Sequence, residues 1–319
     1  MRLRAERSRK HLRLQTETDI RPAGDACESD QGEYVHQTLA EQDAPMNELV
    51  ISPSPTLSGT GRKAVQASAK LWFIVAALGH WIFLAYILAV FFPPVAERGL
   101  AGLEGLHLPA GFRAGDLLGN LASVSHVLLA AIVIGGGPLQ LIPLIRQRVP
   151  RFHRWLGRSY LVAAMLSAAG GLFMTWTRSP IGDSISKFGI SIDAVLILFF
   201  GAMALRFALA RKIDVHRRWA LRLFMAASAV WFFRIALMAW VDVTGGIGID
   251  WDTFTGPFLY LLGFGQYLLP LAMLEWYFLA RRSTSIAVQV TFSTTLLVLT
   301  GVMGLGIVQA TINMWLPRI

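Results

Sequence analysis

The chain has 319 residues, of which 54% are hydrophobic and 15% charged, and its formal net charge is +9. Soluble domains carry about 25% charged residues, so a soluble fold of this apolarity would expose large apolar patches. The basic residues cluster between apolar runs, which is typical of loops facing anionic lipid and argues against nucleic acid as the partner. Cys27 is the only cysteine, which excludes a disulfide framework or a paired-thiol haem attachment within one chain.

Residues 1–68 differ in composition from the rest of the chain. They are rich in charged residues, Ser, Thr, Pro and Gln, and they contain no sustained apolar run. A segment of this kind cannot bury enough apolar surface to offset the entropy of ordering it. We therefore predict a disordered cytosolic tail over residues 1–68.

Seven long apolar runs then follow one another between Leu71 and Ala310. A spanning helix needs roughly 20 mainly apolar residues, because about 30 Å of hydrocarbon is covered at 1.5 Å per residue. The runs predict an all-α, polytopic transmembrane bundle of seven spans over residues 69–319. The predicted spans are 71–92, 123–145, 159–177, 188–210, 219–241, 256–279 and 286–310.

The loops between these runs alternate in charge. Loops 146–158, 211–218 and 280–285 are rich in Arg and Lys, whereas loop 242–255 has neither and carries three Asp residues. Basic loops stay on the cytosolic side, where anionic lipid is their expected partner. We therefore expect a multipass protein of a bacterial inner membrane, with its N-terminus in the cytosol and its C-terminus outside.

Two basic loops end in similar sequences, His-Arg-Trp-Leu-Gly-Arg-Ser-Tyr from residue 153 and His-Arg-Arg-Trp from residue 216. The simpler interpretation is anchoring, with aromatic rings at the headgroup level and arginines on lipid phosphate. In the alternative, the two histidines hold a metal or the iron of haem b, and the arginines hold propionates or a phosphate. The candidate residues on this face are His153, Arg154, Arg158, Tyr160, His216, Arg217 and Arg218.

These two boxes resemble a family of predicted membrane proteins called domain of unknown function 2306. The resemblance also includes His126 in the second run, the Gly137-Pro138-Leu139-Gln140 sequence and Arg234 after the second box. It covers residues 120–241 and implies a membrane architecture, but no assigned activity. The chain departs from the family pattern at Ala220, where such proteins usually carry Met.

Ionisable groups within a membrane are costly, so they are functional candidates by default. At 1.5 Å per residue, Asp193 and Arg234 lie at matching depth on successive antiparallel spans, which predicts an ion pair. One interpretation is a structural pair that fixes helix register. The other is a polar cavity that opens outward and binds a small ligand or relays protons, formed by His126, Gln140, Asp193, Arg234 and Gln266.

Two further features concern the backbone and a lone imidazole. The Gly135-Gly136-Gly137-Pro138 sequence predicts a break in the second span, because Pro removes an intrahelical hydrogen bond. His80 stands alone in the first span, and we expect it to bond a nearby carbonyl oxygen rather than a ligand.

No nucleotide-binding loop, zinc-protease motif or nucleophile elbow is present, so we expect no soluble-type enzymatic chemistry. The favoured function is binding or transport of a small molecule or ion through the outward-facing polar cavity. The alternative is a redox protein that holds b-type haem or quinone between its helices.

Overall fold

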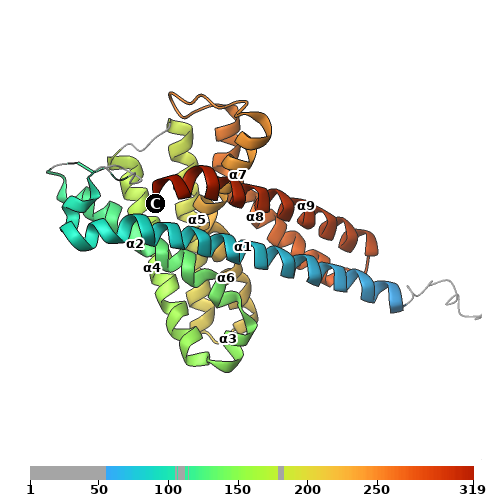
Figure 1. Ribbon diagram of the computed structural model, residues 1–319. Coiled ribbons are helices and arrows are strands. Elements are labelled where there is room, and N and C mark those ends of the chain that lie inside the picture. Colours follow the sequence, from blue (N-terminus) through green and yellow to red (C-terminus); the bar gives the residue numbers. More distant parts are fainter. Residues whose placement is uncertain (1–54, 105, 107–111, 114, 179–182) are drawn as a thin grey trace, which may run out of the picture. The chain divides into compact units, whose positions relative to one another are not determined.

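The computed structural model describes residues 55–104, 106, 112–113, 115–178 and 183–319, and every regular element within them is helical (Figure 1). The principal helices are α1 (Pro55–Arg98), α2 (Leu117–Leu141), α3 (Pro143–Arg148), α4 (Pro150–Thr177), α5 (Ser184–Leu209), α6 (Ile213–Ala227), α7 (Ala229–Thr244), α8 (Pro257–Arg282) and α9 (Ile286–Ala310). The predicted all-α fold class is confirmed.

The helices α1, α2, α4, α5, α8 and α9 are each long and apolar enough to cross a membrane. The pair α6 and α7 passes the same test only as one span, which is bent by 48°. The described part of the chain therefore holds six spans, or seven when the bent pair counts as one, which agrees with the predicted multipass bundle. Short runs of 3₁₀ and π-helix follow α1 and α9.

Helix α1 begins earlier than the sequence predicted. It starts at Pro55, so residues 55–68 are helical rather than disordered. Val65 is only 1% exposed and packs in a cluster with Ala280, Phe292 and Leu296 of α8 and α9. This apolar contact explains why the helix extends beyond the membrane-spanning run. The rest of the predicted tail, residues 1–54, lies outside the described residues.

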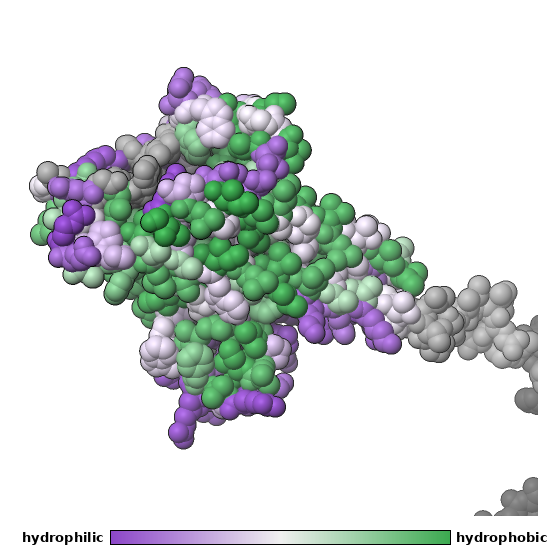
Figure 2. All heavy atoms as spheres, viewed as in Figure 1, coloured by the Kyte–Doolittle hydropathy of each residue, from purple (hydrophilic) through white to green (hydrophobic). Residues whose placement is uncertain are grey.

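The short connections gather Lys and Arg at one end of the bundle, which we call the basic end. There α2 and α8 end and α4 and α6 begin, and the basic residues are Arg146, Arg148, Arg151, Arg154, Arg211, Lys212, Arg217, Arg218, Arg281 and Arg282. Figure 2 shows hydrophobic residues (green) over much of the helices, with hydrophilic residues (purple) at the lower tip, where Figure 1 places α3.

The predicted break at Gly135–Pro138 is wrong, because α2 runs through these residues to Leu141. The glycines serve packing instead. A Cβ atom on Gly137 would lie 2.9 Å from Cε2 of Phe224 and 3.1 Å from Cε2 of Tyr160. Only glycine lets α2 approach α4 and α6 this closely at that position.

The break in a span falls at Ser228 instead, between α6 and α7. His80 of α1 lies against this break: its Nε2 atom is 3.1 Å from the Ser228 hydroxyl, and its Nδ1 atom is 2.7 Å from the Ala76 carbonyl oxygen. Trp231, which is fully buried, packs over the His80 ring with a centroid distance of 4.0 Å. His80 is therefore a bonded core residue, as expected.

Candidate functional site

A cavity of about 1780 Å³ lies between the helices and reaches the basic end of the bundle. One face of α8 lines it for nearly the whole length of that helix, so we call it the α8 cavity. Most of its lining is apolar, from Leu, Phe, Met, Ala and Val side chains of α5 to α9. Its charged lining residues come almost entirely from the basic end, where they form what we call the basic mouth. The mouth holds His153, His216, one carboxylate, Asp214, and seven arginines, which are Arg146, Arg154, Arg158, Arg217, Arg218, Arg281 and Arg282.

The first predicted box forms the opening turns of α4, which begins at Pro150. Proline is well placed in the first turn of a helix, because the amide hydrogen it lacks would have no intrahelical partner there. His153 and Arg154 follow in the first turn of this helix, and Arg158 lies four residues after Arg154 on the same face. The side chain of Gln140, at the end of α2, donates from Nε2 to the carbonyl oxygen of His153 at 3.1 Å. This bond ties the two helices together at the basic mouth.

The second predicted box lies in the first turns of α6. The Nδ1 atom of His216 is 2.8 Å from the carbonyl oxygen of Ala204, which fixes the imidazole ring against α5. The guanidinium of Arg218 lies 5.6 Å from the ring centre of Phe278 on α8. Helix α6 is thus held between α5 and α8 with its basic residues at the cavity.

The structure brings the two boxes together at one site. All seven candidate residues, His153, Arg154, Arg158, Tyr160, His216, Arg217 and Arg218, line the α8 cavity. Burial lowers the pKa of His153, and the nearby positive charges of the mouth, that of Arg146 first among them, lower it further. Cations held this close repel one another, so an anionic group at the mouth would lower the electrostatic energy of the site.

Two buried polar atoms of the lining have no hydrogen-bond partner among the described residues. They are the hydroxyl of Tyr160, whose side chain is 7% exposed, and Nδ1 of His153. Buried polar atoms in native proteins are nearly always hydrogen-bonded, and an unmade bond costs about 1–3 kcal/mol. An unpaired hydroxyl and an unpaired imidazole nitrogen at the mouth therefore point to a polar ligand that hydrogen-bonds to them. No group of three or more His, Cys, Asp or Glu side chains among the described residues is arranged to hold a metal ion.

Residues 123–249 match the family model described as "Predicted membrane protein (DUF2306)". The resemblance inferred from the boxes is confirmed over this stretch. The DUF2306 stretch covers about two fifths of the chain and contains both boxes. Neither the comparison with curated proteins nor the comparison with solved structures found a match to the chain.

The DUF2306 stretch also contains four of the five residues predicted to line an outward-facing cavity. Of these four, Gln140 lines the α8 cavity, whereas His126, Asp193 and Arg234 do not. Gln266, which lies beyond the stretch, also lines it, with its Nε2 atom bonded to the Gly263 carbonyl oxygen at 2.8 Å. The cavity thus combines two residues of the predicted outer site with the whole predicted basic site.

The predicted ion pair between Asp193 and Arg234 is wrong. Arg234 donates to the carbonyl oxygen of Val230 at 3.0 Å and lies 5.3 Å from the ring centre of Phe83 on α1. Asp193 is 7% exposed, and its Oδ1 atom has no hydrogen-bond partner among the described residues. The two residues therefore do not pair, although their predicted depths match.

His126 is held in a similar way by the backbone. Its Nδ1 atom is 3.0 Å from the carbonyl oxygen of Ser167 on α4. Its ring lies next to Gly171, where a Cβ atom would be 3.3 Å from Cε1 of the imidazole. The residue thus joins α2 to α4.

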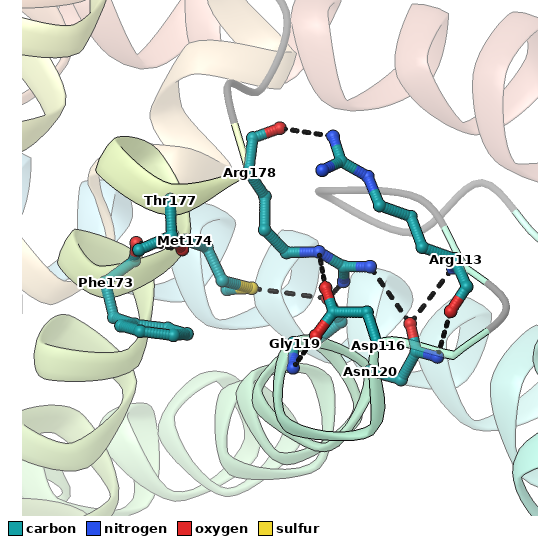
Figure 3. A network of polar contacts seen from close by, with 9 residues as sticks. Arg113, Asp116, Gly119, Asn120, Phe173, Met174, Thr177 and Arg178 are labelled. Atoms are coloured by element: carbon teal, nitrogen blue, oxygen red, sulfur yellow. Dashed lines mark hydrogen bonds and ion pairs between the residues drawn. The ribbon is translucent and has the colours of Figure 1, made fainter.

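The sequence analysis missed a polar network at the end of the bundle opposite the basic end (Figure 3). Arg178, just after α4, is 2% exposed, and its Nε atom lies 3.1 Å from Oδ2 of Asp116. Its guanidinium also donates to Oδ1 of Asn120 and to the hydroxyl of Ser123, each at 3.0 Å. Asp116 caps α2 by accepting from the amide of Gly119 at 2.8 Å. The network fastens the start of α2 to the end of α4.

Proposed function

We propose that this protein binds an amphipathic membrane molecule with an anionic headgroup, taken from the leaflet at the basic end. The observation that carries the proposal is the α8 cavity, which joins a mouth of seven arginines and two histidines to a long apolar lining. Hydrocarbon chains are stabilised by such a lining, and phosphate or carboxylate groups by arginines. This retains binding of a small molecule as the function and moves the expected site from the outer side to the basic end.

The basic mouth supplies more than a general attraction to anionic lipid. Arginines on a loop meet headgroups at the membrane surface, whereas Tyr160 lies within α4, seven residues deeper than His153. At 1.5 Å per residue this is roughly 10 Å further along the helix. Its buried hydroxyl gives the site a donor that a surface-bound lipid would not reach.

We further propose that the basic end faces the cytosol, as the excess of Lys and Arg in its loops predicts. Reporter fusions placed after Lys212 and after Asp250 lie on opposite sides of the span formed by α6 and α7. The fusion after Lys212 should report the cytosol, and the fusion after Asp250 should report the outside. The reverse assignment would place the proposed headgroup site in the other leaflet.

The binding proposal is tested with the full-length protein in lipid nanodiscs. Phosphatidic acid, titrated into phosphatidylcholine discs and followed by native mass spectrometry, should bind in preference to the neutral lipid. Replacing Arg154 and Arg217 by Gln should weaken this binding by about tenfold or more, because each removes a charge-assisted hydrogen bond. Arg98→Gln, at the far end of α1, is the matched control and should change nothing.

Two outcomes would contradict this proposal. Equal binding of phosphatidic acid to the wild type and the double variant would show that the basic mouth is not the headgroup site. An absorption band of reduced b-type haem in the purified protein would favour the redox alternative, for which the proximity of His153 and His216 is the supporting observation.

A further inference from the structure

The lining of the α8 cavity extends far beyond the basic mouth. Residues of α8 that line it recur at three- and four-residue intervals, which places them on one face of the helix. Representative members are Phe258, Leu262, Gln266, Leu269, Met273 and Tyr277. From Phe258 to Arg281 this face is roughly 35 Å long at 1.5 Å per residue.

This length exceeds what one leaflet provides. The hydrocarbon core of a bilayer is about 30 Å thick, so each leaflet contributes about 15 Å. Beyond the midplane the cavity is still lined, by Trp240 and Val243 at the end of α7 and by Leu305 of α9 among others. A glycerophospholipid anchored at the basic mouth would fill the half of the cavity nearer its headgroup. The other half would have to be filled by the hydrocarbon chains of other lipids.

The chemistry of the face also limits what moves along it. Between Phe258 and Tyr277 its one amide side chain is Gln266, whose Nε2 atom already bonds the Gly263 carbonyl oxygen. Moving a charged headgroup along such a lining would strip it of hydrogen bonds at a large cost in free energy. The cavity therefore suits a headgroup that stays at the basic mouth and a chain that extends across the midplane.

The volume of the cavity agrees with a long chain. Pockets for drug-sized ligands are about 300–1,000 Å³, whereas this cavity measures about 1780 Å³. A single long hydrocarbon chain makes the most contact with the apolar lining when it fills the cavity from end to end. At the mouth, the Tyr160 hydroxyl and His153 Nδ1 have no partner among the described residues; the hydroxyl donates to a phosphate-ester oxygen, and so does Nδ1 in the tautomer that carries its proton there.

We propose that the ligand of the α8 cavity is a long-chain polyisoprenyl phosphate, with its phosphate at the basic mouth and its chain crossing the bilayer midplane along α8. This inference rests on the proposed function and narrows it from anionic amphiphiles in general to one class. The distinguishing property is chain length, because the headgroup chemistry alone is shared with phosphatidic acid.

Two glycines of α8 provide a matched pair of variants. Gly265 lines the cavity, Gly263 does not, and a Cβ atom at either position would meet no atom within 4 Å. Gly265 lies about 16 residues from Arg281, roughly 24 Å along the helix and beyond the midplane. Leucine at Gly265 would therefore obstruct a long chain and leave a short chain in place, whereas leucine at Gly263 would obstruct neither.

The experiment compares undecaprenyl phosphate, farnesyl phosphate and phosphatidic acid in nanodiscs of the full-length protein, with dissociation constants from native mass spectrometry. Undecaprenyl phosphate should bind most tightly. Gly265→Leu should weaken its binding by about tenfold, because apolar contact beyond residue 265 is lost. Farnesyl phosphate should bind Gly265→Leu, Gly263→Leu and the wild type equally.

Each remaining outcome has a distinct meaning. The long-chain inference is overturned, and the proposed function stands, if all three lipids bind with equal affinity, if that affinity falls when Arg154 and Arg217 are replaced, and if Gly265→Leu leaves it unchanged. If none of the lipids binds, or if replacing the two arginines leaves their affinity unchanged, the proposed function itself fails. Weakening of undecaprenyl phosphate by Gly263→Leu as strongly as by Gly265→Leu would place the chain outside the cavity and also overturn the inference.

Discussion

Replacing Arg178 by Gln should lower the free energy of unfolding by about 3 kcal/mol, the lower part of the range for breaking a buried ion pair. Arg178 is 2% exposed and contacts Asp116, Asn120 and Ser123, so its loss leaves several polar atoms without their partner. The lower part of the range applies because the Asp116 side chain is 38% exposed and recovers some hydration. Thermal and denaturant unfolding in detergent would measure the loss.

The control for this change is Arg113→Gln. Arg113 donates from its side chain to the backbone carbonyl oxygen of Arg178 at 2.7 Å and should contribute much less, because that oxygen can be hydrated instead. Adding Asp116→Asn to Arg178→Gln should cost less than the two single losses added together, since no lone carboxylate remains. Strictly additive losses would show that Arg178 and Asp116 do not depend on each other.

Replacing Gly306 by Ala should destabilise the bundle by about 1–3 kcal/mol, the usual cost of overpacking a core. A methyl group on Gly306 of α9 would overlap the backbone carbonyl oxygen of Ile235 on α7. Backbone cannot rotate away as a side chain can, so the two helices would have to separate. This contact is where α7 and α9 approach most closely through a glycine.

The same helix provides two matched controls, Gly301 and Gly304. A Cβ atom at either position meets no atom within 4 Å. Alanine there should be neutral or stabilise the helix by up to about 1 kcal/mol, because Gly loses more conformational freedom on folding. Equal destabilisation at positions 301, 304 and 306 would mean that loss of glycine itself, and not the approach of α7, is responsible.

The spans and the basic end follow from the sequence because both reflect simple physical limits. The thickness of the hydrocarbon sets the length of each apolar run, and water on either side sets where Arg and Lys lie. The convergence of the two boxes also follows, since each box begins a span at the same end. The sequence thus places His153 and His216 at one level, and the structure adds that both line one cavity.

The pairing of Asp193 with Arg234 could not be predicted from depth. Depth along a helix follows from the rise per residue, but the direction of a side chain depends on the rotation of each helix about its axis. Arg234 of α7 turns toward Phe83 of α1, and Asp193 of α5 is buried with its Oδ1 atom unpaired among the described residues. Packing between helices sets these rotations, and the rotation of each helix cannot be predicted from a single sequence.

The break in a span was misplaced for a related reason. Gly135–Pro138 has the local composition of a break, yet α2 runs through it, and Tyr160 and Phe224 pack closely against Gly137. Ser228 has no such composition, and its hydroxyl at the break bonds His80 from α1. Arg178 carries no signal of its own in the sequence, but Asp116 before an apolar run is a helix-cap signal that marks the start of α2, where the network forms.

The bend at Ser228 has a consequence for how the protein enters the membrane. Helices α6 and α7 have 15 and 16 residues, so each is roughly 23 Å long and neither crosses the bilayer alone. Helix α6 also carries Arg217, Arg218 and Arg222, which disfavour partition into lipid as the nascent chain leaves the translocon. Biogenesis of this span thus depends on the two halves entering together, with α5 already in place to receive His216 at the Ala204 carbonyl oxygen.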